Sequence, residues 1–194
     1  MRNYCIAILL ILATIAPEGC IFEPRTAETP ETGTDLYPWI VPNRPKDVFA
    51  NLASGVASNR DSNYERSLDS LFTFIPSVEA EEAYRGRFAD WTKTVELDVL
   101  GRIKTTYLGA RSAQFGYANL RFDSEDEVGS VAHFRGPYTI TLNRGDGSPA
   151  QIYAGEAIFT IIQGTQGWVL FKWEDIQPLP GGNPTSGMLR GALR

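Results

Sequence analysis

The chain has 194 residues, enough for one domain of ordinary size with its own hydrophobic core. Its formal net charge is −5, and Lys and Arg are interspersed with Asp and Glu, so no basic stripe could neutralise nucleic-acid phosphates. The only histidine is His133, which excludes a His-based metal cluster. We therefore expect no nucleic-acid partner, no metal and no cofactor.

The first residues have the pattern of a processing signal. Arg2 supplies a positive charge, and an apolar run follows over residues 5–16. A membrane-spanning helix needs about 20 apolar residues, whereas the core of a secretory signal peptide needs roughly 7 to 15. The run is too short to span a membrane. It also lacks the polar face of an N-terminal core helix, so it predicts export by a cleaved signal peptide.

Gly19 and Cys20 follow this run, and the segment resembles the lipobox of bacterial lipoproteins, in which a small residue precedes the cysteine that becomes lipidated. The two residues before Gly19 depart from that pattern. The resemblance implies removal of residues 1–19, acyl chains such as palmitate on Cys20, and a membrane-anchored protein of the bacterial cell envelope that faces the periplasm. Cleavage after Ala16 by the ordinary signal peptidase is the alternative. We favour lipidation, because Cys20 would otherwise be an exposed thiol without a disulfide partner.

Two segments have a composition that does not predict a packed domain. Residues 20–44 are rich in Pro, Thr and Glu, and they predict a stiff tether between the lipid and the domain. The exception is a short apolar cluster of Tyr37, Trp39, Ile40 and Val41, which we expect to pack on the domain. Residues 177–194 are rich in Pro and Gly and predict a mostly flexible tail.

The segment between them contains helical and strand patterns in turn. Apolar residues at helical spacing predict helices over residues 45–59, 62–71 and 90–103, with a short strand at residues 72–74. From residue 106 onward, apolar residues recur at every second position. This spacing predicts four antiparallel strands over about residues 110–122, 131–142, 151–163 and 168–175, with an acidic loop at residues 123–129.

This order predicts an α+β domain over residues 45–176, in which three helices pack on one face of a curved, mostly antiparallel sheet. The helical pair, Trp91 followed by Glu96, and above all the closing residues 167–175 resemble the nuclear transport factor 2-like superfamily, which has a cone-shaped fold. That superfamily also includes ketosteroid isomerases and polyketide cyclases. The resemblance implies a fold and says little about activity, because the superfamily hosts enzymes, transport factors and domains without chemistry.

Aromatic side chains are the candidates for a ligand pocket, because such pockets have mostly apolar walls with a few polar groups. The candidates are Tyr64, Trp91, Tyr138 and Trp173, although aromatic residues in such positions are more often part of the core.

An enzyme of the resembled fold would place a carboxylate in an apolar cavity, and Glu156 is the candidate catalytic residue. Its alternative is an exposed strand carboxylate or one paired with Arg135. His133 falls on the strand face opposite Phe134, so we expect an inert side chain that faces solvent. The Tyr and Asp pair of the ketosteroid isomerases has no alignable match.

We therefore expect a cell-envelope lipoprotein whose non-catalytic domain binds a small apolar ligand or another protein. The alternative is an isomerase or cyclase-type enzyme that uses Glu156. The last two strands are apolar on both faces, with Val169, Phe171 and Trp173 expected opposite Trp168 and Leu170. Helices cover only one face, so we expect the other face to be covered by a homodimer or by residues 39–41.

Overall fold

The computed structural model describes residues 38–57, 61–108, 122–143, 146–177 and 181–194, all within one compact unit, Leu36–Arg194. The predicted signal peptide, Cys20, most of the tether and most of the first meander strand lie outside these ranges. None of the helices within them combines the length and the apolar character that a membrane crossing requires.

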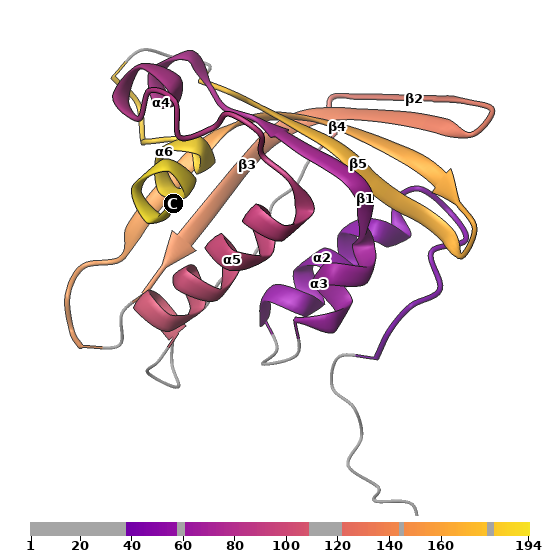
Figure 1. Ribbon diagram of the computed structural model, residues 1–194, viewed down its shortest axis with the longest axis horizontal. Coiled ribbons are helices and arrows are strands. Elements are labelled where there is room, and N and C mark those ends of the chain that lie inside the picture. Colours follow the sequence, from indigo (N-terminus) through magenta and orange to yellow (C-terminus); the bar gives the residue numbers. More distant parts are fainter. Residues whose placement is uncertain (1–37, 58–60, 109–121, 144–145, 178–180) are drawn as a thin grey trace, which may run out of the picture. The chain divides into compact units, whose positions relative to one another are not determined.

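Most of the described helices lie on one face of the sheet (Figure 1). The described helices are α2 (Asp47–Ala57), α3 (Ser62–Ser67), α4 (Val78–Ala83), α5 (Lys93–Ile103), the π-helical turn η1 (Lys104–Leu108) and α6 (Ser186–Leu193). The apolar positions of α2 and α5 point into the core, where Val48, Leu52, Val56, Val99 and Leu100 are buried. Both helices confirm the predicted spacing.

The sheet has the strand order β1-β5-β4-β3-β2. Its strands are β1 (Leu68–Ile75), β2 (Ser124–Val128), β3 (Val131–Leu142), β4 (Gln151–Gly164) and β5 (Gly167–Ile176). β1 pairs with β5 in parallel, and the other neighbours are antiparallel. The bounds of β3 are those predicted, and its alternation is unbroken, so Phe134 is buried while His133 is exposed.

Several predicted boundaries are wrong. The second helix ends at Ser67, because the chain turns to extended backbone at Leu68 and pairs with β5. The helix expected from residue 90 begins at Lys93, where the Thr92 hydroxyl accepts a hydrogen bond from the Val95 amide. Part of the predicted acidic loop is strand β2, which pairs with β3 along its whole length.

The expected face of Trp173 is also wrong. Ile161 of β4 pairs with Leu170, but Thr160 pairs with Lys172, so Phe171 is an extra residue in β5. Such a bulge shifts the alternation of the strand by one residue. Trp173 therefore shares the helix-covered face with Leu170, and both are fully buried.

The tail prediction is wrong for residues 181–194, which contain α6. Glycine acts there as a packing residue: a Cβ atom on Gly187 would lie 2.9 Å from Asp175 Oδ2, and one on Gly191 would lie 2.5 Å from the Tyr84 ring. Leu189 and Arg190 of the same helix are buried. The glycines let α6 approach the domain closely. Their role is close packing, although a Pro- and Gly-rich composition is also typical of a flexible tail.

The apolar segment ahead of α2 packs on the domain, as predicted. The Asn51 side chain of α2 bonds both the amide and the carbonyl of Ile40, and the Arg66 guanidinium lies 4.1 Å from the centre of the Trp39 ring. Ile40 and Val41 remain 46% and 55% exposed. They therefore do not bury an apolar patch on the outer face of the sheet.

Candidate binding site

A buried carboxylate lies at the centre of the helix-covered face. Glu96 of α5 accepts hydrogen bonds on Oε1 from the Tyr64 hydroxyl (2.7 Å) and Arg190 Nη2 (2.7 Å). Its Oε2 accepts from Trp91 Nε1 (3.0 Å) and Arg190 Nε (3.0 Å). Both carboxylate oxygens are therefore satisfied, as a buried ion pair requires.

The charge of Arg190 decides the ionisation of this carboxylate. Burial alone would raise the pKa of Glu96, but the adjacent guanidinium and the hydrogen bonds from Arg190, Tyr64 and Trp91 hold that pKa below its ordinary value. The guanidinium also lies 4.2 Å from the ring centre of Trp173 and 4.5 Å from that of Phe74. Arg190 thus sits in a cage of one carboxylate and two aromatic faces.

A second buried pair binds the other end of α6. The Tyr138 hydroxyl donates a short hydrogen bond to Asp175 Oδ1 and accepts one from the Ser186 amide (2.7 Å). Asp175 Oδ2 accepts from the Gly187 amide (2.6 Å). Burial is the largest cause that raises the pKa of both Tyr138 and Asp175. These bonds occupy amide groups of the first turn of α6, which have no partner inside the helix.

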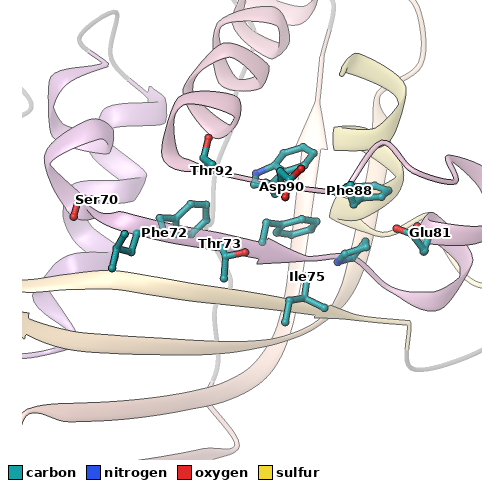
Figure 2. A pocket seen from close by; sticks show the side chains of 13 residues that line it. Ser70, Phe72, Thr73, Ile75, Glu81, Phe88, Asp90 and Thr92 are labelled. Atoms are coloured by element: carbon teal, nitrogen blue, oxygen red, sulfur yellow. The ribbon is translucent and has the colours of Figure 1, made fainter.

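A groove with a volume of about 690 Å³ lies beside β1 (Figure 2). Ser70 and Glu81 lie toward its two ends, and Asp90 and Thr92 lie across from Thr73 and Ile75. Its lining consists of residues 70–76, Glu81 and residues 88–92.

Known structures with a similar architecture identify the fold of this domain. No protein-family model and no curated protein matches the sequence. Solved structures do match, among them an NTF2-like protein with a cystatin-like fold from Novosphingobium aromaticivorans, with 8% identity and a TM-score of 0.51 over 70% of this chain and 80% of that one. The domain has the nuclear transport factor 2-like fold.

Two further solved structures also match this chain. A conserved protein from Planctomyces limnophilus has 14% identity and a TM-score of 0.54 over 68% of this chain and 91% of its own. A protein of unknown function from Mycobacterium tuberculosis has 10% identity and a TM-score of 0.50 over 67% of each chain. At these identities the similarity concerns the fold alone, and it confirms the expected α+β class.

The fold brings the four predicted aromatic residues together on one face. Tyr64 and Trp91 bond Glu96, Tyr138 bonds Asp175, and Trp173 stacks on Arg190. All four are buried, and α6 takes up the space beside them. Their part in binding a ligand stays a prediction.

Glu156 lies elsewhere, on the outer face of the sheet. Its Oε1 accepts a short hydrogen bond from Arg135 Nε on the neighbouring strand, which is the paired surface arrangement considered as its alternative. His133 Nδ1, on the same face, lies 3.3 Å from the Thr160 hydroxyl. Within the described ranges, no three His, Cys, Asp or Glu side chains are grouped so that they could hold a metal ion.

Sequence reasoning missed the polar residues of the interior. Glu96 was noted only as part of the fold pattern, although it falls at helical spacing with the buried Val99 and Leu100, which is a signal for a buried carboxylate. Nothing in the sequence around Arg190 indicated that this residue is buried, because its neighbours predicted a flexible tail.

Proposed function

We propose that this chain is a lipoprotein of the bacterial cell envelope whose nuclear transport factor 2-like domain is non-catalytic and binds another protein through its surface. The observation that carries this proposal is the saturation of Glu96 and Asp175 by groups of α6. These two carboxylates are the ones that the fold buries beside aromatic side chains.

General acid–base catalysis needs a carboxylate within hydrogen-bond reach of a substrate. Glu96 already accepts four hydrogen bonds, and Asp175 is bonded on both oxygens. Glu156, the residue of the enzyme alternative, pairs with Arg135 on the opposite face of the sheet. A substrate or a small apolar ligand would have to displace α6 to reach the interior, so binding of a protein at the surface is the simpler use of the domain.

The closed interior can be tested with an apolar fluorescent probe, anilinonaphthalene sulfonate, added to the chain expressed from Ile21. We expect weak probe binding by the wild type and strong binding by a variant that lacks residues 181–194, because removing α6 exposes aromatic side chains. Binding of one probe per wild-type chain, with quenching of tryptophan fluorescence, would instead favour the small-ligand alternative.

The envelope location rests on the apolar run and on Gly19 and Cys20. Several acyl chains on one cysteine would hold the protein stably, because two hydrophobic anchors already suffice. In a host that makes lipoproteins, we expect the mature protein to carry the acyl mass and to sediment with membranes. Cys20→Ser should release it. A mature chain that begins at Pro17 with an unmodified Cys20 would contradict the proposal.

The proposal includes a homodimer through the outer face of the sheet. Register pairs Val128 with Val131, Val131 with Ile162, and Ile162 with Val169, so these four side chains form one row across β2, β3, β4 and β5. Val128 is 72% exposed, and the other three are half-buried. A row of apolar side chains on an open sheet face is suited to a second copy of the same face.

A further inference from the structure

β1 is an edge strand, and no other described strand pairs with its second side. It pairs only with β5, so about half of its backbone N–H and C=O groups face away from the sheet, toward the groove. Such a row of backbone groups can accept an added strand.

Exposed edges are usually protected by charged side chains or proline. The opposite edge follows this rule, because Glu125, Asp126 and Glu127 are consecutive exposed residues of β2. In β1, residues 70–75 carry no charge, and Leu71 and Ile75 are 74% and 43% exposed. The start of β1 is protected, because Lys93 Nζ donates a hydrogen bond to the Leu68 carbonyl and the Asp69 carboxylate accepts one from the Leu71 amide. Beyond Leu71, the edge as far as Ile75 carries no charged side chain of its own.

The far wall of the groove is fixed in place. Trp91 is bonded to Glu96, and its ring lies 5.4 Å from that of Phe74 and 5.5 Å from that of Phe88. Arg194 donates a hydrogen bond to the carbonyl of Ala89 (3.0 Å). These contacts hold the far wall of the groove in place.

The two charged side chains that line the groove are acidic. Two cations border it, because Arg194 bonds the Ala89 carbonyl and Lys93 bonds the carbonyl of Leu68. Asp90 and Glu81 line the groove, and none of the described lining residues is Lys or Arg. Asp90 is exposed and has a φ of 54°, a left-handed conformation that Asp and Asn adopt more readily than most other residues.

We infer that the groove beside β1 binds an extended basic segment of a partner protein, which adds to β1 as a further strand. This inference rests on the proposed protein-binding function and gives the chemistry of the partner. Directly opposed side chains of neighbouring strands share a face. Partner residues opposite Leu71 and Ile75 are therefore apolar, and the alternate ones, directed toward Asp90 and Glu81, are Lys or Arg.

The probe is a fluorescein-labelled, end-blocked peptide of alternating Lys and Val, and the control peptide alternates Glu and Val. Fluorescence anisotropy with the chain expressed from Ile21 should show binding of the Lys peptide at least about tenfold tighter than that of the Glu peptide. The double variant Glu81→Gln, Asp90→Asn should weaken the Lys peptide by about tenfold and reduce its dependence on salt. Asn is chosen because it tolerates the backbone conformation of Asp90.

The matched control is Asp126→Asn, Glu127→Gln, which removes the same charge from the opposite edge of the sheet and should leave peptide affinity unchanged. Equal melting temperatures of the variants establish that each is folded. An equal loss of affinity in both double variants would show attraction by net charge alone and would overturn the proposal.

Strand addition itself is tested by N-methylation of alternate residues of the Lys peptide. One methylation pattern removes the N–H groups that face β1, and the other removes those that face solvent. We expect the first to abolish binding and the second to preserve it. Equal binding of the two methylated peptides, or equal binding of the Lys and Glu peptides, would overturn the inference. Neither result would affect the proposals of membrane attachment and of a closed interior, because separate experiments measure those. A dimer that takes up no peptide and dissociates on Leu71→Lys would assign the edge to a second copy and also overturn it.

Discussion

The guanidinium of Arg190 forms a two-pronged ion pair with the carboxylate of Glu96, a residue 94 positions earlier in the chain. Both side chains are almost completely buried, with exposures of 4% and 3%. The pair joins the last helix to the centre of the domain, and its removal has consequences for stability that can be measured.

Arg190→Ala should lower the free energy of unfolding by about 3–5 kcal/mol, because it leaves the buried Glu96 charge without a counter-ion. The double variant Glu96→Met, Arg190→Met should lose much less, since it removes both charges together. Urea unfolding followed by tryptophan fluorescence measures both. Arg135→Ala, which breaks the exposed pair with Glu156, is the control and should change stability little. A similar small loss for Arg190→Ala would show that the buried pair has no structural importance.

The ionisation of Glu96 gives a pH dependence of known sign. Its pKa is lower in the folded state than its ordinary value near 4.5, so its contribution to stability is complete above that value and is lost as the pH falls through the folded pKa. The stability advantage of the wild type over Glu96→Gln should therefore decline as the pH is lowered from about 5. Unfolding curves at successive pH values provide the measurement, and a constant difference would contradict the lowered pKa.

Asp175 should behave in the opposite way. Burial raises its pKa above the ordinary value of 3.8, so its contribution to stability is complete below that value and is lost as the pH rises through the folded pKa. Relative to Asp175→Asn, the wild type should become less stable as the pH increases from about 4. The two carboxyl variants thus serve as controls for each other, and slopes of the same sign would refute one of the two assignments.

Gly191 and Gly101 provide a matched pair of helical glycines. A Cβ atom on Gly191 would lie 2.5 Å from the Tyr84 ring, so Gly191→Ala should destabilise the domain by about 1–3 kcal/mol through overpacking. No atom lies within 4 Å of a Cβ on Gly101, so Gly101→Ala should stabilise it by about 0.5–1 kcal/mol through a less flexible unfolded chain. Thermal unfolding compares them directly, and stabilisation by both would show that α6 does not pack as described.

The apolar row on the outer sheet face predicts a dimer that Val169→Glu dissociates. Sedimentation equilibrium of the chain expressed from Ile21 should give the mass of two chains for the wild type and of one chain for the variant. Val78→Glu is the control, because Val78 is 73% exposed on α4 and lies outside the row. A wild-type monomer at high concentration would exclude the dimer.

The fold was predictable where one face of an element is polar. Strand β3 alternates without interruption, and its predicted bounds agree with the structure. The bulge at Phe171 was hidden, because Trp168 to Phe171 are apolar at every position and alternation has no meaning there.

The candidate site was predictable only in part. Aromatic residues such as Tyr64 and Trp173 were expected to lie together, and they do, but the residue that fills the space between them was not foreseen. Arg190 comes from a segment whose glycines resemble those of a linker, and only the tertiary contacts of Gly187 and Gly191 show why glycine is needed. The residues next to a glycine in the sequence do not show that glycine is required when the reason is a contact with a residue far away in the chain.

The position of α6 in the chain also affects when the domain can fold. Every other described helix and strand precedes it, and Glu96 has no counter-ion until Arg190 has been synthesised. A nascent chain that stops before Ser186 would have to bury an unpaired carboxylate in order to close its aromatic interior, which is strongly unfavourable. The aromatic interior should therefore close only after Arg190 has been synthesised.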